Sequence, residues 1–308
     1  MLVRYILKFF SYVEIRTKIA SLLPFLLGLV FACYATGSIH WGLSALFFVS
    51  MTFFDMATTA LNNYIDTKAS NSSLPFRRKT ARWLLFLLLA LATGSGLLLA
   101  LLTGPVVFLT GAVCFFIGIT YTFGPAPLSR MPLGEVFSGL FMGFFIPFLM
   151  VIINSPPDAL VSLTWQTPRL LLSINIPALL RLLLITGPAI TGIANIMLAN
   201  NICDVVHDVA INRFTLPYYV GNRYALQLFT LLYGLAAAFQ ILAALTGTLP
   251  HLSLLSFLTW PLVLRNIRRF LHKQDKSLTF PLSVANFILL VLPPILLTAL
   301  DLLIRRSA

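Results

Sequence analysis

The sequence predicts an all-α, polytopic membrane protein, and two observations carry that prediction. Apolar residues make up 59% of the 308 residues, charged residues make up only 10%, and the mean hydropathy is +0.94. These values lie far outside the range of soluble globular chains. The apolar residues are also gathered into long stretches, and roughly 20 residues of helix cross a hydrocarbon core of about 30 Å. The chain is long enough for about nine such spans with short connections.

The expected helices follow one another in a single domain that covers residues 1–308. We place them at residues 19–38, 42–64, 83–102, 105–123, 133–153, 177–200, 224–246, 248–264 and 280–303. The tightest connection is expected around Thr246–Pro250, because the chain must turn there within a few residues.

Basic residues predict the orientation of these helices. They cluster before the first span, after the second and after the eighth, and 17 of the 21 Lys and Arg fall on one side. By the positive-inside rule that side is cytoplasmic. We therefore expect a cell-membrane protein whose N-terminus and motif-bearing loops face the cytoplasm. The net charge of +12 fits this topology and anionic lipid headgroups. A nucleic-acid partner is not expected, because spans interrupt the basic residues.

A polar stripe lies on one face of the second expected helix. Its members share helical spacing and are Asp55, Thr58 or Thr59, Asn62 and Asp66. Interhelical hydrogen bonds explain the two threonines. Asp55 lies roughly three turns deeper than Asp66, where we expect helix packing or proton handling. A carboxylate next to an amide oxygen at the helix mouth suits a hard cation, so Asn62 and Asp66 are candidate metal ligands.

The same pattern recurs at the end of the sixth expected helix. Asn200 and Asp204 repeat the spacing of the first motif, and Asp208 follows one turn later on the same face. Two carboxylates one turn apart repel each other unless a cation lies between them. Oxygen ligands of this kind suit Mg²⁺, which substrate phosphates often complete. The two sets predict one divided Mg²⁺ site; the alternative for the second set is a pair of solvated acids balanced by Arg213.

Other metal chemistry is not indicated. Cys33, Cys114 and Cys203 lie singly in or beside apolar segments without metal-ligand spacing, so neither zinc nor structural disulfides are expected. His207 is the histidine nearest the second motif, and we expect it to be solvated or to support a ligand indirectly.

Several motifs together carry a resemblance to a known family. They are Glu14–Lys18 before a first helix that contains Pro24, Asn62–Asp66, Tyr121–Pro125, Pro132–Phe137 and Asn200–Leu216. The chain resembles the UbiA superfamily of intramembrane prenyltransferases, and within it the 1,4-dihydroxy-2-naphthoate polyprenyltransferases (MenA type) of menaquinone synthesis. The resemblance implies nine helices around a central cavity, with two Asp-rich loops that bind an isoprenoid diphosphate through Mg²⁺. It implies transfer of a polyprenyl group to an aromatic acceptor, with loss of CO₂ and diphosphate, to give demethylmenaquinone.

The resemblance also assigns roles to single positions. The matches are Asn62, Asp66, Asp204 and Asp208 as catalytic Mg²⁺ ligands, and Arg213, Lys18, Tyr121, Asn200 and Glu135 as substrate contacts. Arg213 follows the second motif and is a natural phosphate contact. Glu135 matches the loop acid of the family, where a structural ion pair and a catalytic role are equally open.

The first motif departs from the family pattern. Asn63 stands where the family usually has Asp, and Ser70, Asn71 and Ser72 follow where another acid is usual. The first half-site is therefore short of negative charge. Three alternatives stay open: its Mg²⁺ is held loosely, uses the Asn63 carbonyl oxygen, or takes most of its ligands from the substrate diphosphate.

Other functions remain as alternatives. Within the enzyme class, 4-hydroxybenzoate or homogentisate is the rival acceptor, and only the resemblance of Tyr121–Pro125 favours the naphthoate. A secondary transporter can show similar repeats and ionisable residues. Against transport, the acids lie at one membrane face and the long Phe-rich helices lack a polar path. A non-catalytic quinone- or lipid-binding subunit is the third alternative. The sequence sets neither prenyl chain length nor oligomeric state.

Overall fold

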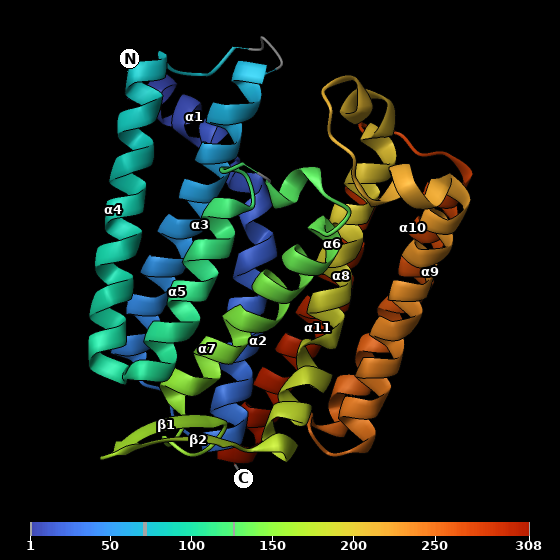
Figure 1. Cartoon of the computed structure of the whole chain (residues 1–308). Coiled ribbons are helices and arrows are strands. Elements are labelled where there is room, and N and C mark those ends of the chain that lie inside the picture. Colours follow the sequence, from blue (N-terminus) through green and yellow to red (C-terminus); the bar gives the residue numbers. More distant parts are fainter. Residues whose placement is uncertain (1, 70–72, 126, 308) are drawn as a thin grey trace.

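The computed structural model describes residues 2–69, 73–125 and 127–307, in which long helices run side by side (Figure 1). The first part of the chain contains α1 (Leu2–Tyr12), the 3₁₀-helix η1 (Ile15–Lys18), α2 (Ile19–Thr36), α3 (Trp41–Ala69), α4 (Arg78–Thr103) and α5 (Pro105–Thr120). Pro105 begins α5 at a position where proline's missing N–H would have no helical partner.

The second part begins with an irregular stretch and ends in three long helices. It contains the 3₁₀-helix η2 (Leu128–Arg130), α6 (Gly134–Ser138), the π-helix η3 (Gly139–Phe144), α7 (Phe145–Asn154), the strands β1 (Val161–Gln166) and β2 (Arg169–Ile174), α8 (Ile176–Ala210), α9 (Leu216–Leu245), the 3₁₀-helix η4 (His251–Thr259), α10 (Trp260–His272) and α11 (Phe280–Ser307). The antiparallel hairpin β1–β2 was not expected from the sequence.

Within the described ranges, seven helical segments are long and apolar enough to cross a membrane. They are Ile15–Thr36, Trp41–Thr67, Arg78–Thr103, Gly134–Asn154, Ile176–Ala210, Leu216–Leu245 and Phe280–Arg305. Helix α5 is a shorter apolar helix of 16 residues. The prediction of an all-α, polytopic membrane protein is confirmed.

The helix expected at 248–264 takes a different form. The chain returns along α11 first as η4 and then as α10, which continues to His272. Helix α10 buries Val263, Ile267 and Phe270 and exposes Arg265 and Arg268, so it is amphipathic. Hydropathy alone marks the apolar run before Arg265 and misses the helical turns that follow it.

Both motifs lie in helices, not in the Asp-rich loops that the family resemblance implied. Helix α8 runs ten residues past Asn200. Asp204 and Asp208 therefore follow Asn200 at i+4 and i+8 on one helical face. It ends where the backbone N–H of Ile211 donates to the carbonyl oxygen of Asp208 (3.1 Å) and Asn212 takes a left-handed conformation (φ 57°).

Three buried apolar clusters hold the helices together. One joins α2 with α8–α11, the second joins α2, α3 and α7, and the third joins α1, α3 and α4. The π-helix η3 packs directly on α8, where a Cβ at Gly143 would lie 2.6 Å from the Cα of Ile190. Only glycine allows this approach. It sets the η3 wall beside the helix that carries the second motif.

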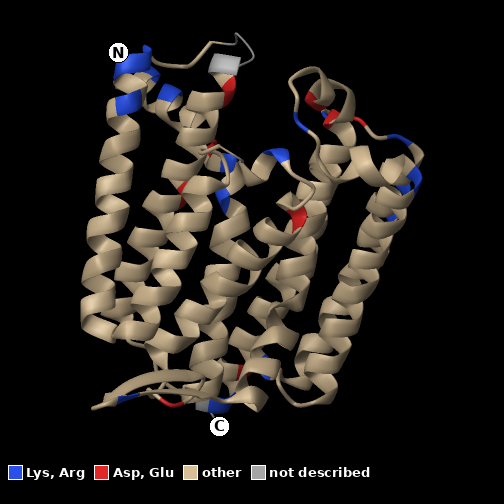
Figure 2. Ribbon diagram, in the orientation of Figure 1, with Lys and Arg blue, Asp and Glu red and all other residues tan. Residues whose placement is uncertain are grey.

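The two ends of the bundle differ in charge. Most Lys and Arg lie at the end that holds α1 and the connection between α10 and α11 (Figure 2). The hairpin β1–β2 lies at the opposite end (Figure 1). The positive-inside rule predicts that this basic end faces the cytoplasm. The orientation in the membrane itself stays a prediction.

Candidate active site

A cavity of about 660 Å³ lies between the helices. Its body is apolar, with aromatic and aliphatic side chains from α3, α4, α5, η3 and α7, among them Phe47, Leu99, Phe108, Phe141, Phe145 and Leu149. Its polar lining near the motif-bearing helix ends comes from Glu14, Asn62, Tyr121, Thr122, Asn200 and Arg213. A long apolar chamber with polar groups near one end suits an amphiphilic ligand.

The first motif presents Asn62 to this cavity. The Oδ1 atom of Asn62 accepts a hydrogen bond from the Thr122 hydroxyl at 3.3 Å, which ties α3 to the segment after α5. Asp66 lies one turn beyond Asn62 on the same helix face. Of the positions that departed from the family pattern, Ser70, Asn71 and Ser72 lie outside the described residues.

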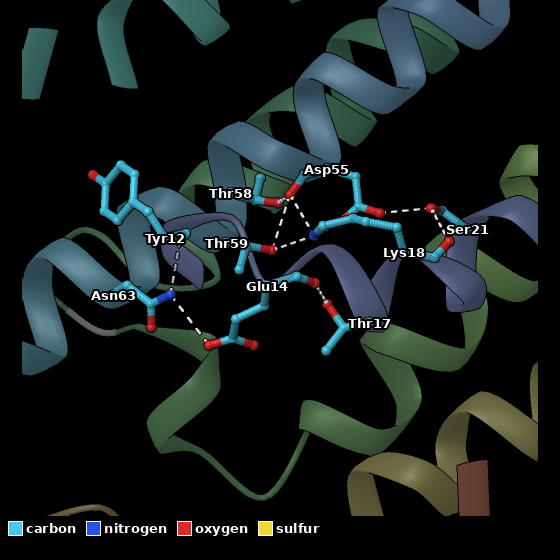
Figure 3. A network of polar contacts seen from close by, with 9 residues as sticks. All are labelled: Tyr12, Glu14, Thr17, Lys18, Ser21, Asp55, Thr58, Thr59 and Asn63. Atoms are coloured by element: carbon cyan, nitrogen blue, oxygen red, sulfur yellow. Dashed lines mark hydrogen bonds and ion pairs between the residues drawn. The ribbon is translucent and has the colours of Figure 1, made fainter. Parts of the chain in front are cut away.

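Asn63 is directed to a different neighbour. Its amide nitrogen donates to the backbone oxygen of Tyr12 at 2.9 Å and to Oε1 of Glu14 at 3.1 Å (Figure 3). The residue that replaces the usual Asp therefore fastens α3 to the end of α1. An aspartate at this position would accept hydrogen bonds only and would face the Glu14 carboxylate.

The second motif already holds a cationic group. The ammonium of Lys276 contacts both Oδ1 of Asn200 and Oδ2 of Asp204. It also lies 5.0 Å from the centre of the Phe280 ring, a cation–π distance. Asn200 and Asp204 thus direct two oxygen atoms at one positive charge.

The connection between α10 and α11 presents Lys276 through a folded turn. Oδ1 of Asp275 accepts hydrogen bonds from the Ser277 amide (2.9 Å), the Ser277 hydroxyl (2.7 Å) and the Leu278 amide (3.0 Å). Thr279 closes the turn by donating to the backbone oxygen of Lys273 at 2.8 Å. These bonds fix the loop backbone on both sides of Lys276.

Asp208 and Arg213 lie at the end of α8. Asp208 is 4% exposed, and its Oδ2 atom has no hydrogen-bond partner among the described residues. The backbone N–H of Arg213 donates to the backbone oxygen of Asp208 (2.8 Å), and its Nε donates to the backbone oxygen of Ser129 (2.9 Å). The guanidinium keeps four further N–H groups and lines the cavity. Asp208, in contrast, does not line the described cavity wall.

Tyr121 and Glu135 meet behind the second motif. Oε1 of Glu135 accepts from the Asn201 amide at 2.9 Å, while its Oε2 has no partner among the described residues. Tyr121 lines the cavity, and burial, with a smaller contribution from Glu135, raises the pKa of its hydroxyl above the usual range despite nearby Arg213. The Tyr121 hydroxyl therefore remains a hydrogen-bond donor at physiological pH. Glu135 is buried beside Asn201 and does not line the cavity.

Lys18 lies deeper than the motif ends. Its ammonium contacts Oδ1 of Asp55 (2.6 Å) and the Thr59 hydroxyl (2.6 Å), while the Ser21 hydroxyl donates to Oδ2 of Asp55 (2.5 Å) (Figure 3). The side chain of Lys18 is 11% exposed, and that of Asp55 is 16% exposed. This ion pair joins η1 to α3 beside the cavity, which Asp55 lines, so the ammonium is directed at Asp55.

The structure brings the two motifs to one cavity through Asn62 and Asn200. Asp66 and Asp204 each lie one helical turn beyond these residues. Within the described part of the chain, no three His, Cys, Asp or Glu side chains gather closely enough to hold a metal ion. The candidate ligand set therefore depends on amide oxygens as well as on carboxylates.

Sequence reasoning missed Lys276 and Thr122. Lys276 is one of several basic residues after the eighth expected span, and its partner Asp204 is 72 positions away. Thr122 belongs to the Tyr121–Pro125 motif, but its bond to Asn62 requires α3 and α5 to be neighbours. Neither contact has a local sequence signal.

Comparison with known proteins places this geometry in a family. Residues 21–291 match the UbiA prenyltransferase family. A relative from Bacillus subtilis (strain 168), named 1,4-dihydroxy-2-naphthoate octaprenyltransferase, is 26% identical over 275 residues, which are 84% of this chain and 80% of that protein.

Solved structures show the same fold. A UbiA homologue from Aeropyrum pernix K1 without ligand has a TM-score of 0.67 at 18% identity, covering 91% of this chain and 98% of that one. A UbiA homologue from Archaeoglobus fulgidus, bound to GPP and Mg²⁺, has a TM-score of 0.64 at 16% identity, covering 95% and 99%. Since the family match spans most of the 308 residues, the chain belongs to the UbiA prenyltransferase family and is a membrane-embedded prenyltransferase.

Proposed function

We propose that this enzyme transfers a polyprenyl group from polyprenyl diphosphate to 1,4-dihydroxy-2-naphthoate, releasing diphosphate and CO₂ and forming demethylmenaquinone. The observation that carries the proposal is the pair of Asn-and-Asp motifs at the polar end of one apolar cavity. In the second motif, Asn200 and Asp204 direct their oxygen atoms at the Lys276 ammonium. The name of the Bacillus subtilis relative supports the naphthoate as acceptor. The Archaeoglobus fulgidus homologue, bound to GPP and Mg²⁺, supports a prenyl diphosphate donor.

The residues fit a Mg²⁺ requirement. Asn200 and Asp204 converge on the Lys276 ammonium, and the partnerless Oδ2 of Asp208 is a buried acceptor. Hard oxygen donors of this kind suit Mg²⁺. We propose that Asn62, Asp66, Asp204 and Asp208 hold the metal, and Mg²⁺ would supply neutralisation of the diphosphate charge. The acid-poor first motif would depend most on oxygen atoms of the substrate.

Arg213 and Lys276 would bind the diphosphate from opposite sides of the second motif. Arg213 is held by Ser129 through Nε, which leaves the outer edge of its guanidinium for phosphate oxygens. Lys276 balances the charge of Asp204. On donor binding we expect its ammonium to transfer from Asp204 to a phosphate oxygen, which frees Asp204 for the metal and Asn200 for contact with the substrate.

The cavity body would protect the reacting carbon from water. The C1–O bond of the donor breaks, diphosphate takes the electron pair, and an allylic cation remains that water would quench. Phe54 and Phe115 stack with ring centres 3.9 Å apart, and Phe141 and Phe145 also line the cavity, so the chamber offers aromatic rings to the cation. A ring carbon of the acceptor then forms the new C–C bond, and the carboxyl group leaves as CO₂.

Roles for the remaining predicted residues follow from their positions. Tyr121 lines the cavity as a donor and would contact the acceptor or the diphosphate. Glu135 would position Asn201 and the Tyr121 segment without touching substrate, since it lies behind the wall. Lys18 would shape the chamber through Asp55, and its predicted contact to the substrate would require its ammonium to leave that carboxylate.

Localisation belongs to the same proposal. The basic end of the bundle would face the cytoplasm of a cell membrane, so that the water-soluble diphosphate enters there and the quinone product leaves into the bilayer. The whole chain, residues 1–308, would act as one domain.

The test is a transfer assay with separate acceptors. Membranes that contain the protein, Mg²⁺ and a prenyl diphosphate are offered 1,4-dihydroxy-2-naphthoate or 4-hydroxybenzoate, and lipid-soluble products are identified by mass. We expect a decarboxylated prenyl naphthoquinol with the first acceptor and no product when EDTA replaces Mg²⁺. If product forms from 4-hydroxybenzoate and not from the naphthoate, the proposed acceptor is wrong. Turnover that survives EDTA would overturn the metal requirement.

A further inference from the structure

The hairpin β1–β2 has two faces of different chemistry. Residues directly opposite each other in an antiparallel pair share a face, and neighbours along a strand alternate. The register therefore puts on one face the pairs Val161 with Ile174, Leu163 with Leu172 and Trp165 with Leu170. The other face carries Ser162 with Ser173, Thr164 with Leu171 and Gln166 with Arg169. One face is entirely apolar, and the other is polar except for Leu171.

Most of the apolar face is exposed. The exposed fractions are 72% for Trp165, 63% for Leu172, 57% for Leu170 and 45% for Ile174. An isolated two-stranded hairpin is marginally stable in water, and an apolar patch of this kind on a protein surface marks a contact with something else.

The base of the hairpin is attached to the bundle. Val161, at the start of the apolar face, packs against a buried cluster that contains Val107, Leu149 and Leu160, and Ser162 on the other face is buried as well. The hairpin is thus joined at its base to the membrane-embedded core. Further along the strands the hairpin lies across this end of the bundle, below α4 and α5 (Figure 1), and both of its faces are exposed from Thr164 to Ile174. At the end of a membrane-spanning bundle, the layer beside such a hairpin is the lipid interface.

The position along the bundle supports the same partner. The hairpin connects the end of α7 with the start of α8, at the end of the bundle opposite the motifs (Figure 1). Trp165 and Arg169 lie near its turn, and tryptophan and arginine are the residues that settle at the level of lipid headgroups. At the end of neighbouring α4, Leu101 is 83% exposed, which is the exposure expected of a lipid-facing side chain.

We propose that residues 161–174 form an interfacial anchor, with the apolar face of the hairpin inserted into the bilayer leaflet opposite the active site. The polar face, with Thr164 and Gln166, meets water, and the Arg169 guanidinium meets lipid phosphate. The anchor fixes the depth of the α7–α8 connection in the membrane. It is independent of the acceptor and of the metal proposed above.

Tryptophan fluorescence tests the anchor. A variant with Trp165 as its sole tryptophan (Trp41→Phe, Trp83→Phe and Trp260→Phe) is reconstituted in phosphatidylcholine vesicles. Quenching is compared for lipids brominated near the headgroup end of the acyl chain, lipids brominated near the chain terminus, and aqueous iodide. We expect blue-shifted emission, strongest quenching by the shallow bromolipid and little by iodide.

A matched variant moves the reporter to the polar face. Thr164→Trp combined with Trp165→Phe, in the same background, shifts the indole by one residue and so to the other face. Its fluorescence should then be quenched strongly by iodide and weakly by the bromolipids. Retained binding of prenyl diphosphate shows that both variants are folded. Equal iodide quenching of the two variants would overturn the proposal. So would quenching protection that appears only at high protein density, since that result would assign the face to a second copy of the chain.

Discussion

The two motifs have the same spacing but different surroundings. The motif on α3 offers one carboxylate, Asp66, and its neighbour Asn63 is committed to Tyr12 and Glu14. The motif on α8 offers two carboxylates and has two cationic side chains beside it, Lys276 and Arg213. The difference teaches that a repeated pattern in a sequence does not make two equivalent half-sites.

The consequence is a division of labour that can be tested. The α8 half-site is charge-balanced in part by the protein itself, because the Lys276 ammonium pairs with Asp204. The α3 half-site has less charge of its own and would be completed by the donor.

The largest effect is expected from removing a carboxylate. Asp204→Ala and Asp66→Ala should each lower prenyl transfer by roughly 10²–10³-fold or more, because each half-site neutralises the departing diphosphate. Turnover is measured in membranes with protein abundance matched by immunoblot. Asp158→Ala, at an exposed acid in the connection after α7, is the control and should leave turnover unchanged. Retained turnover in Asp66→Ala would show that the α3 half-site is dispensable.

Lys276→Met should move two affinities in opposite directions. Without its ammonium, Asp204 is free for a divalent ion, so Mn²⁺ binding to the donor-free protein should tighten by about tenfold. Prenyl diphosphate should bind about tenfold more weakly, because a charge-assisted phosphate contact is lost. Electron paramagnetic resonance of Mn²⁺ and calorimetry with the diphosphate measure the two.

The matched control for that experiment is Lys273→Met. Lys273 lies in the same loop, and its side chain is 62% exposed. Its ammonium pairs with Oδ2 of Asp275 at 3.4 Å and not with Asp204. Both affinities should stay as in the unchanged protein. If Lys276→Met weakens metal and diphosphate together, Lys276 supports the site structurally and does not exchange partners.

The smallest effect is expected from restoring an acid to the α3 half-site. Asn63→Asp alone places a carboxylate against Glu14, so the gain in metal attraction is offset by repulsion. Asn63→Asp combined with Glu14→Gln removes that repulsion. The double variant should lower the Mg²⁺ concentration for half-maximal transfer by about fivefold, as one nearby charge in a wet site contributes about 1 kcal/mol. An unchanged Mg²⁺ requirement would mean that charge shortage does not limit this half-site.

The sequence was sufficient for the fold class, the family and the two motifs, because hydropathy and helical spacing are local properties. Asn62 and Asn200 were predicted to meet and do line one cavity. Assignments of Asp66, Asp204 and Asp208 as metal ligands stay predictions. The expected span ended at residue 200 because apolar length was the criterion for a span, whereas the helical spacing of Asn200, Asp204 and Asp208 already indicated the turns that α8 adds beyond it.

Contacts between distant segments could not be predicted. Lys18 was predicted to contact the substrate, and its ion pair with Asp55 depends on the packing of η1 beside α3, which no local pattern in the sequence predicts. The hairpin was missed for a related reason, since its alternation is short and lies between two much stronger apolar segments. In both cases the deciding free energy comes from tertiary packing.

The turn that presents Lys276 has a consequence for acid tolerance. Hydrogen bonds from the Ser277 side chain and from the amides of Leu278 and Ser277 lower the pKa of Asp275 from 3.8 to about 2. A lowered pKa stabilises the folded turn above the ordinary value of the carboxyl, and that stabilisation is lost only as pH falls through about 2. Protonation of Asp275 therefore does not loosen this turn at the acidities that a cell reaches. An acid limb in the activity profile well above pH 2 would come from a group other than Asp275.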